Sequence, residues 1–306
     1  MVPYALAGSV VKGYTGGVVV PASGVRYGWT DTYRTTKKAT DTAMIILPEG
    51  SYFEFIVPDT IATFQVTQTA KAAGYYSTSA TSDITVIKLG AGGSLDGIVQ
   101  PAYKFTDSRD GREYGYVGIG NLEWFTENLD YREAGSGYAG ADDLGYITGR
   151  LYTWKEATSG VSGSGLGGGP QGACPAGWSV PTNEDWEDLA KAVSGEDMSF
   201  LSSWNNLADL LKANATLNSD KFWPFSINVA SNFENSFGWN ALASGMGYDG
   251  FKHFEGLKSY AYFWSSTERD SDNAFYRYIY YDIPHFPFNY TAKGDAGFSV
   301  RCVRKK

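Results

Sequence analysis

The chain of 306 residues is long enough for two domains of ordinary size, and its 43% hydrophobic and 19% charged residues are typical of a globular protein. Its 37 glycines and 22 tyrosines predict many short strands separated by turns, which excludes a helix bundle. The net charge of −8 excludes binding to nucleic acid by bulk electrostatic attraction, and two histidines with two cysteines leave little material for a metal site.

The N-terminal sequence carries no recognisable targeting segment. The chain has no run of about 18 apolar residues, so we expect no insertion into a membrane. The start, MVPYALAGSVVKGYTGG, lacks the basic and apolar regions of a signal peptide. Three readings stay open: a mature protein whose signal has been removed, a cytosolic protein, and a virion protein that needs no signal.

Residues 1–105 are expected to form an immunoglobulin-like β-sandwich that serves for attachment or spacing. Short apolar or alternating runs are separated by clusters of Gly, Pro, Ser and Asp, at roughly the 8–12-residue spacing of a sandwich. The region shows no catalytic cluster. The expected strands lie at 7–14, 17–22, 43–48, 51–58, 63–70 and 83–90.

A change of composition marks the second domain, which we expect over residues 106–306. Residues 90–111 have the Gly- and Asp-rich composition of a junction between domains. Eight of the nine tryptophans lie beyond residue 120, and both cysteines lie beyond residue 170. This shift places the boundary near residue 105.

One helix is strongly predicted in this domain, between Thr182 and Gly195. Thr182 suits the N-cap, the acidic residues after it suit the positive end of the helix dipole, and Gly195 suits the C-cap. Apolar residues recur on one face in between, as in an amphipathic helix. The other expected elements are a second helix within 205–213, strands at 260–268 and 297–305, and a flexible surface loop at 163–172.

The two cysteines, Cys174 and Cys302, are candidates for a disulfide. They are too few for a structural zinc site without histidine, and the histidines lie far from them in the sequence. A bridge would close a loop of about 128 residues and contribute roughly 4–5 kcal/mol. It would also imply an oxidising final location. The alternative is a pair of reduced, buried thiols, and we favour the disulfide.

Six separated motifs stand in the order typical of one family. With them, residues 112–305 resemble the Fibrobacter succinogenes major paralogous domain, which is common in Bacteroidetes and Fibrobacteres. The resemblance implies an α+β, C-type-lectin-like fold, in the branch that includes formylglycine-generating enzymes, and it implies a bridge between Cys174 and Cys302. It does not extend over residues 1–105. The motifs are NLEWFTENLDY (121–131), GRLYTWKEA (149–157), CPAGWSVPTNEDWEDL (174–189), GWNALASGMGYDG (238–250), YFWSSTE (262–268) and GFSVRCVRK (297–305).

Two activities found on this fold lack their residues here. The calcium-dependent lectins use Glu-Pro-Asn or Gln-Pro-Asp together with Trp-Asn-Asp, and none of these triplets occurs in the sequence. The formylglycine-generating enzymes need a redox pair of cysteines in the active site, whereas both cysteines of this chain match the structural positions. Neither activity is therefore expected.

The same branch also includes the variable proteins of diversity-generating retroelements. These elements randomise adenines, so that targeted Asn codons can give Tyr, His, Asp, Asn, Ile, Phe, Ser, Pro and Arg but never Lys, Glu, Gln, Met or Trp. Residues 276–290, YRYIYYDIPHFPFNY, use only the permitted types. They also precede the GFSVRCV strand, where the variable surface of that fold lies. A surface diversified by a retroelement is one interpretation, and a surface of fixed sequence is the other.

The stretch 276–290 is the candidate ligand-binding surface. Partial alternation predicts a strand over 276–282, and Pro284 and Pro287 interrupt it, so a loop is expected over 283–291. Loop tyrosines offer large, stiff contact areas with polar tips. The alternative is that these aromatics pack against their own domain or a neighbouring subunit. The proposed binding residues are Tyr276, Tyr278, Tyr280, Tyr281, Asp282, His285, Phe286, Phe288, Asn289 and Tyr290.

The sequence predicts no metal centre and no cofactor. Asp270, Asp272 and Asn273 begin like a calcium-binding loop, but Phe275 and Tyr281 stand where an EF-hand has Gly and Glu. A solvated turn is favoured, and an irregular calcium site stays open.

Catalytic residues are also not predicted. His253 and His285 have no evident nucleophile partner, and the sequence contains neither a GxSxG nor an HExxH motif. Tryptophans inside the family motifs are expected in the core rather than as carbohydrate platforms. They are Trp154, Trp178, Trp186, Trp239 and Trp264.

The sequence as a whole predicts a non-enzymatic display protein that binds a protein or glycan receptor on a cell surface. The first domain would anchor it to a cell envelope or a virion, outside the cell, and the second would present the aromatic surface. Diversification by a retroelement and carriage on a gut phage are favoured. A Bacteroidetes adhesin of fixed sequence and a formylglycine-generating-like oxidoreductase are the alternatives. A homotrimer is one open oligomeric state.

Overall fold

The computed structural model divides the chain into two compact units, Met1–Gly92 and Gly93–Lys306, which are described separately. The division lies upstream of residue 105 because strand β8 (Tyr103–Thr106) pairs with β9 (Glu113–Ile119) of the second unit. The backbone is described for residues 4–6, 10–14, 28–37, 41–46, 52–56, 63–71, 78–87, 95–135, 143–217, 220–228 and 233–306, and the side chains for residues 86, 95–135, 145–216, 221–228 and 233–306.

The described part of the first unit consists of strands. Five form a sheet in the order β1-β7-β6-β3-β4, and two form the pair β2-β5. The strand expected at 17–22 lies outside the described residues, and β3 is not among the expected strands because it is rich in Thr rather than in alternating apolar residues. The immunoglobulin-like sandwich stays a prediction. The strands are β1 Tyr4–Leu6, β2 Val10–Tyr14, β3 Gly28–Lys37, β4 Asp41–Ile46, β5 Tyr52–Ile56, β6 Thr63–Lys71 and β7 Thr78–Ile87.

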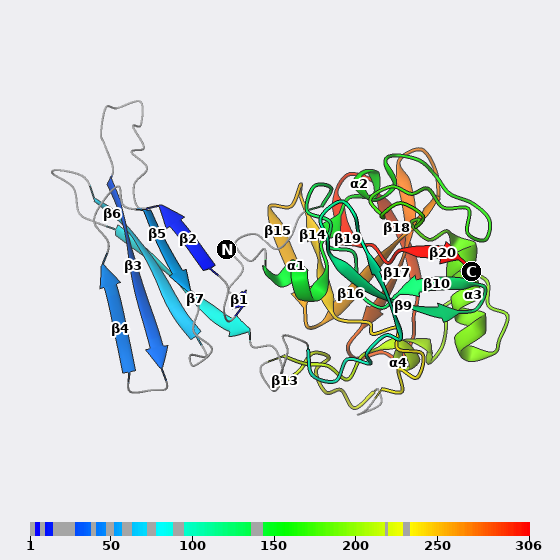
Figure 1. Cartoon of the computed structure of the whole chain (residues 1–306), viewed down its shortest axis with the longest axis horizontal. Coiled ribbons are helices and arrows are strands. Elements are labelled where there is room, and N and C mark those ends of the chain that lie inside the picture. Colours follow the sequence, from blue (N-terminus) through cyan, green and yellow to red (C-terminus); the bar gives the residue numbers. More distant parts are fainter. Residues whose placement is uncertain are drawn as a thin grey trace. The chain divides into compact units, whose positions relative to one another are not determined.

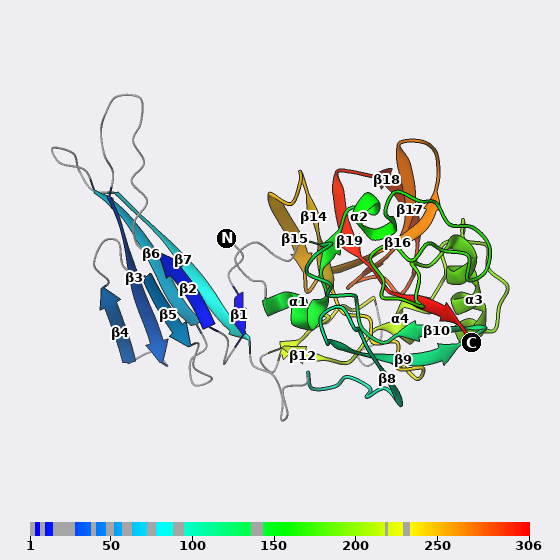
Figure 2. The same ribbon diagram turned by 45° about the horizontal axis from the view of Figure 1, so that its top comes forward.

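The second unit is built on a mixed seven-stranded sheet. Its order is β11-β19-β14-β16-β17-β18, with β15 paired to β14 and an additional pairing between β19 and β16. A four-stranded sheet has the order β20-β10-β9-β8, and β12 and β13 form a small pair (Figures 1 and 2). The C-type-lectin-like fold stays a prediction. The remaining strands are β10 Leu122–Phe125, β11 Leu151–Tyr152, β12 Thr216–Leu217, β13 Asp220–Lys221, β14 Ser244–Tyr248, β15 His253–Leu257, β16 Tyr260–Glu268, β17 Asn273–Tyr280, β18 Phe288–Ala292, β19 Ala296–Ser299 and β20 Val303–Lys305.

The strongly predicted helix is confirmed as α3. The Thr182 hydroxyl accepts the N–H of Asp185, the Asp185 carboxylate accepts the N–H of Thr182, and Gly195 forms the left-handed C-cap. The second predicted helix is α4, which is shorter than 205–213. Figure 2 shows α3 near β9 and β10, with which it makes contact. The helices are α1 Asp143–Thr148, α2 Trp154–Thr158, α3 Asn183–Ser194 and α4 Leu207–Leu211.

The glycine-rich segment 163–172 is fixed by hydrogen bonds, which corrects the expectation of a flexible loop. The N–H of Gly167 donates to the Asp185 carboxylate over 2.5 Å, and the N–H of Val180 donates to the carbonyl of Pro170 over 2.9 Å. A Cβ atom on Gly169 would lie 1.9 Å from the carbonyl oxygen of Val180. Its glycines therefore permit close packing against the domain.

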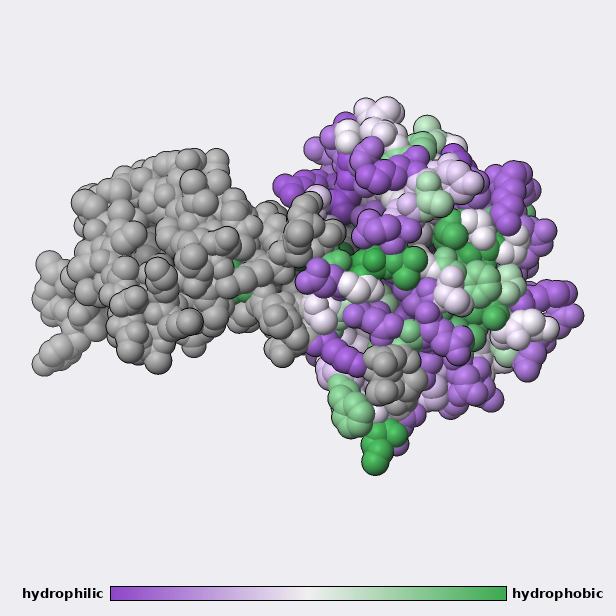
Figure 3. Space-filling model, turned by 60° about the horizontal axis from the view of Figure 1, so that its bottom comes forward, coloured by the Kyte–Doolittle hydropathy of each residue, from purple (hydrophilic) through white to green (hydrophobic). Residues whose placement is uncertain are grey.

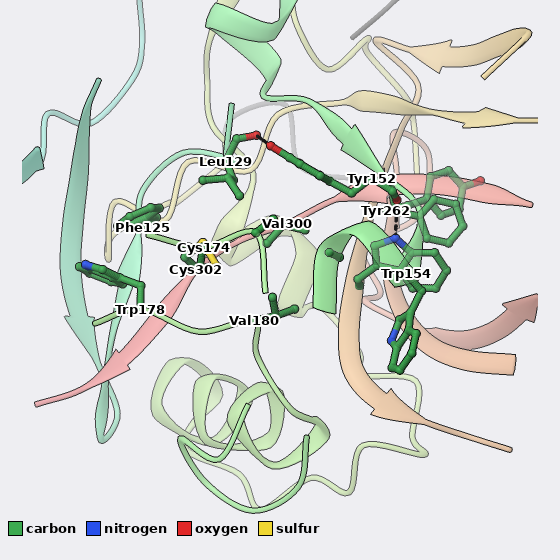
Figure 4. Close-up of a cluster of buried hydrophobic side chains, with 14 of the residues drawn as sticks. Phe125, Leu129, Tyr152, Trp154, Cys174, Trp178, Val180, Tyr262, Val300 and Cys302 are labelled. Carbon is green, nitrogen blue, oxygen red and sulfur yellow. Dashed lines mark hydrogen bonds between the residues drawn. A yellow bond between two sulfur atoms is a disulfide. The ribbon is translucent and has the colours of Figure 1, made fainter. Parts of the chain in front are cut away.

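The predicted disulfide is present between Cys174 and Cys302. The Cα atoms are 5.9 Å apart, and both residues are completely buried. Figure 4 shows the bridge in the hydrophobic core, near Trp178 and Val300. The core location predicted for the motif tryptophans is also confirmed: Trp154, Trp178, Trp186, Trp239 and Trp264 are each at most 2% exposed.

The strand predicted over 297–305 is broken into two. β19 pairs in the large sheet, and β20 pairs with β10 in the small one. Between them, the buried guanidinium of Arg301 donates to the carbonyls of Phe125 and Trp239, and Cys302 forms the disulfide. This short connection therefore joins the two sheets of the unit.

Candidate ligand-binding surface

Residues 276–290 form a β-hairpin. β17 contributes Tyr276 to Tyr280, residues 281–287 form the loop, and β18 returns antiparallel beside β17, with Tyr276 opposite Asn289. The prediction of a strand followed by prolines in a loop is confirmed. The expectation that the loop continues to residue 291 is wrong, because the chain resumes pairing one residue after Pro287.

One side of this hairpin carries a cluster of tyrosines, which we call the tyrosine face. Cross-strand pairing sets Tyr280 opposite Tyr260, and Tyr278 opposite Tyr262, with ring centroids 4.7 and 5.9 Å apart. Tyr262 is 7% exposed, and the other four rings are partly exposed. The cluster rests on the buried ring of Phe298, 4.9 Å from Tyr262. The tyrosine face consists of Tyr260, Tyr262, Tyr276, Tyr278 and Tyr280.

Two of these tyrosines are absent from the sequence-based site. Tyr260 and Tyr262 lie on β16, where the alternate residues Ala261 and Phe263 are also apolar and are fully buried. A strand that is apolar on both sides shows no alternation from which an outward face could be inferred. Only the pairing of β16 with β17 shows that these residues lie beside Tyr278 and Tyr280.

Three phenols of the tyrosine face have raised pKa values and are uncharged at physiological pH. Burial, followed by the nearby hydroxyls of Tyr278 and Tyr280, raises the pKa of Tyr276 to about 12. Burial also raises the pKa of Tyr278, and burial together with a hydrogen bond to Tyr280 raises that of Tyr262. These phenols therefore stay protonated, and each presents a ring face and a hydroxyl that can donate and accept.

The opposite side of β17 is part of the core. Arg277 is completely buried, its guanidinium lies 3.2 Å from the ring centroid of Trp204, and it donates to the carbonyls of Phe200, Ser202 and Phe286. Burial holds the pKa of Arg277 well below its ordinary value. This side chain joins two connecting segments to the sheet, so it is structural.

The loop 281–287 is held mainly through its backbone. The N–H of Tyr281 donates to the carbonyl of Ser259, and the N–H of Phe286 donates to the carbonyl of Trp204, each over 2.9 Å. The carbonyl of Pro284 accepts the N–H of Ala208 on α4 over 3.0 Å. The loop is thus attached to α4, to the segment before α4 and to the turn before β16.

The structure divides the ten predicted binding residues between different environments. Tyr276, Tyr278 and Tyr280 belong to the tyrosine face, and the register places exposed Asn289 beside Tyr276. The loop residues Tyr281, Asp282 and His285 are partly exposed. Phe288 and Tyr290 lie opposite Arg277 and Phe275, and therefore on the other side of the hairpin.

Phe286 does not belong to the surface, contrary to the expectation. It is completely buried, and its ring packs against Trp186, Trp204 and Phe263 at centroid distances of 5.8, 5.8 and 6.1 Å. A large apolar residue between two prolines can leave the loop and enter the core, and the sequence alone does not show which way it points.

The free edge of β18 is capped by its own side chain. The Oδ1 of Asn289 accepts the backbone N–H of Tyr290 over 2.9 Å, and both residues are exposed. The ring of Tyr290 is covered by the guanidinium of Arg269 at 3.4 Å. The N–H of Tyr290 is therefore not available as a donor to an incoming strand.

The segment 269–273 is a tight turn, as favoured over a calcium loop. The Oδ1 of Asp270 accepts the backbone N–H groups of Asp272 and Asn273 over 3.0 and 2.8 Å. Within the described part of the chain, no three His, Cys, Asp or Glu residues are grouped so that they could hold a metal ion. The carboxylate of Asp270 is thus used in the turn.

The two histidines lie in different parts of the second unit, His253 at the start of β15 and His285 in the loop 281–287. His253 is exposed and stacks on Tyr248, with centroids 5.2 Å apart. His285 lies in the loop, and its Nδ1 is buried without a described hydrogen-bond partner.

Hydrophobic residues also reach the surface away from the hairpin. Phe225 and Ile227 are 73% and 89% exposed, more than the other large hydrophobic residues among those described. Figure 3 shows hydrophobic residues among hydrophilic ones on one side of the second unit.

No helix among the described residues is long and apolar enough to cross a membrane.

Comparison with known proteins gives one result. The sequence model of the Fibrobacter succinogenes major domain matches residues 117–304, from β9 to β20. No curated protein and no solved structure matches the chain. The matched region covers more than half of the chain and includes the tyrosine face, the loop 281–287 and both cysteines. The chain therefore belongs to the Fibrobacter succinogenes major domain family.

Proposed function

We propose that this protein is a non-enzymatic, extracellular display protein that binds a protein or glycan receptor through the tyrosine face and the adjoining loop 281–287. The observation that carries the proposal is the clustering of five tyrosines from β16 and β17, four of them partly exposed, on one side of the sheet. Rigid aromatic rings with polar tips give much contact area at a low entropic cost.

The arrangement of the hairpin also supports binding rather than packing alone. On the Arg277 side of β17, Phe286 is completely buried, whereas Tyr260, Tyr276, Tyr278 and Tyr280 lie at the border of the core cluster that contains Phe298. The tyrosine rings contact one another and Phe298, yet four of them keep surface that water can reach. A side chain that serves only packing needs no such polar tip.

The test is a binding screen with matched variants. The purified chain is applied to a printed array of neutral and acidic oligosaccharides and of peptides, next to a Tyr278→Ser/Tyr280→Ser variant. We expect at least one array feature that binds the wild type and loses about tenfold or more in signal with the variant. A Tyr103→Ser variant serves as control, because Tyr103 is 60% exposed on β8, in the other sheet. Equal loss in the control, or no loss in the variant, would contradict the proposal.

We further propose that a retroelement diversifies the sequence of this surface. The protein would be carried on a phage virion or a cell envelope. Its first unit would be a β-sandwich that serves as the anchor, and its second unit would have a C-type-lectin-like fold. The buried residues Arg277 and Phe286 give this idea a sharp genomic test. A near-copy of the codons for 276–290 beside a reverse-transcriptase gene should carry adenines at codons of exposed positions, and none at those two. Absence of any near-copy would leave an adhesin of fixed sequence.

The oxidoreductase alternative is weakened by the disulfide. A formylglycine-generating-like enzyme needs two accessible thiols, whereas the only two cysteines of the sequence are joined and completely buried. Titration of the native protein with a thiol reagent should therefore give no reaction. Two reactive thiols would revive the enzyme.

A further inference from the structure

A buried lysine lies directly beneath the loop 281–287. The side chain of Lys212, at the end of α4, is completely buried. Its Nζ donates to the carbonyl of Ile283 over 3.2 Å and to the carboxylate of Asp209 over 3.1 Å. The rings of Trp223 and Phe233 lie 5.4 and 5.1 Å from the amine. The charge is thus held between two aromatic rings, one carboxylate and one loop carbonyl.

Such a lysine is an unfavourable choice for stability alone. Burial penalises the charged amine and lowers the pKa of Lys212, although Asp209 and, more weakly, Asp282 act in the opposite sense. A methionine would fill a similar volume between Trp223 and Phe233 without that penalty. What the amine adds is a hydrogen bond to the carbonyl of Ile283 in the middle of the loop.

The other contacts of the loop make this bond effective. On one side of Ile283, the N–H of Tyr281 is bound to Ser259, and on the other side the carbonyl of Pro284 is bound to Ala208. The described hydrogen bonds of residues 281–287 are all made by backbone groups of the loop. The side chains of Tyr281 and His285 make no hydrogen bond that the structure describes. The hydrogen bonds that hold the loop therefore do not involve those two side chains.

We infer that Lys212 is a positioning residue that fixes the backbone of loop 281–287, and that Tyr281 and His285 are the side chains of this loop that set ligand preference. The second half of the inference rests on the proposed function. The first half concerns the order of the loop and can be tested without a ligand.

The test of the first half compares two lysine–aspartate pairs in the full-length protein. Lys212→Met/Asp209→Asn removes the buried charge without leaving a carboxylate opposite an apolar group. Lys191→Met/Asp197→Asn is the matched control, because this pair is also in contact, over 2.6 Å, but is 60% and 83% exposed. Amide hydrogen exchange and thermal melting are measured for both.

A positioning role predicts a local effect. The amide of Phe286, which is bound to Trp204, should exchange about tenfold faster in the Lys212 variant, while amides of β17 keep their rates. The melting temperature should stay within about 2 °C of the wild type or rise, because a buried charge is lost. Unchanged exchange at Phe286 would overturn the inference. A lower melting temperature with faster exchange throughout the unit would also overturn it, since Lys212 would then only support the fold.

The second half is tested with Tyr281→Ala and His285→Ala on the oligosaccharide and peptide array. Both variants should melt and exchange like the wild type, while the order of array signals changes. An unchanged order would remove these side chains from the preference of the site. If the wild type binds no array feature, the proposed function fails, and the exchange experiment still decides the role of Lys212.

Discussion

The five residues from Tyr276 to Tyr280 of strand β17 alternate between two sides that differ in burial. Tyr276, Tyr278 and Tyr280 point to a side where the rings stay partly exposed. Arg277 and Ile279 point to a side where both are completely buried, and where the guanidinium binds three carbonyls. A strand can therefore be held firmly by one side while the other remains free for contact.

This difference shows how a surface rich in tyrosine can be presented without loss of the fold. The hairpin is supported on the Arg277 side by buried contacts and by backbone contacts of the loop, and on the other side the tyrosine rings pack against Phe298 at the border of the core. Changes on the tyrosine face should then alter recognition more than stability. Four experiments can break or sharpen this contrast, from the largest expected effect to the smallest.

Removal of the disulfide should affect both sides equally. In a Cys174→Ser/Cys302→Ser variant, we expect a loss of about 4–5 kcal/mol in the free energy of unfolding, because the unfolded chain gains the freedom of a loop that spans 128 residues. Urea denaturation followed by tryptophan fluorescence measures the loss. An unchanged denaturation midpoint would contradict this expectation, since the stability of the unit would then not depend on the disulfide.

Truncation of one ring on each side gives the most direct test. Phe286→Ala should cost about 3–5 kcal/mol, because the ring is completely buried among other aromatics, whereas Tyr280→Ala should cost about 1 kcal/mol. Denaturation midpoints of the two variants are compared with the wild type. Equal losses would show that the tyrosine face is part of the core.

Alkaline pH should probe the tyrosine face through Tyr276, when the wild type is compared with a Tyr276→Phe variant. The pKa of Tyr276 is about 12 in the folded protein and 10.0 in the unfolded chain, so the unfolded state loses its proton first and stability falls as the pH rises above about 10. At pH 11 this group alone should cost about 1 kcal/mol. Denaturation at pH 9 and 11 gives the slope, and Tyr276→Phe should reduce it. An identical slope in the variant would place the ring in water.

The smallest effect is expected at the free edge of β18. Asn289→Ala should cost about 0.5 kcal/mol, because it removes the acceptor that caps the N–H of Tyr290. The exposed N–H then becomes available to another strand, so light scattering at high concentration should rise. Asn289→Asp keeps an acceptor oxygen and is the control. Equal scattering by both variants would assign the effect to charge or solubility.

Much of the local structure could be predicted from the sequence. Thr182 and Gly195 mark the ends of α3 because capping depends on residues that are close in the sequence. The strand β16 was also predictable from its run of aromatic residues. The pairing of the cysteines followed from their number and from the resemblance to the family.

The features that the sequence did not predict depend on contacts between residues that are distant in the chain. Tyr260 and Tyr262 join the tyrosine face only through the register of β16 with β17. Phe286 enters the core because Trp186, Trp204 and Phe263 surround it, and these residues are scattered along the chain. The break between β19 and β20 likewise arises because the two strands join different sheets. No local pattern contains this information.

The connection between β19 and β20 has a consequence for the time course of folding. β19 lies between β11 and β14 in the large sheet, and β20 pairs with β10, some 180 residues earlier in the chain. During synthesis, both sheets stay incomplete until these last strands of the unit leave the ribosome. The unit should therefore fold late and slowly, as expected for strand pairings between distant residues. If Cys174 is oxidised before Cys302 leaves the ribosome, its native disulfide partner is not yet present.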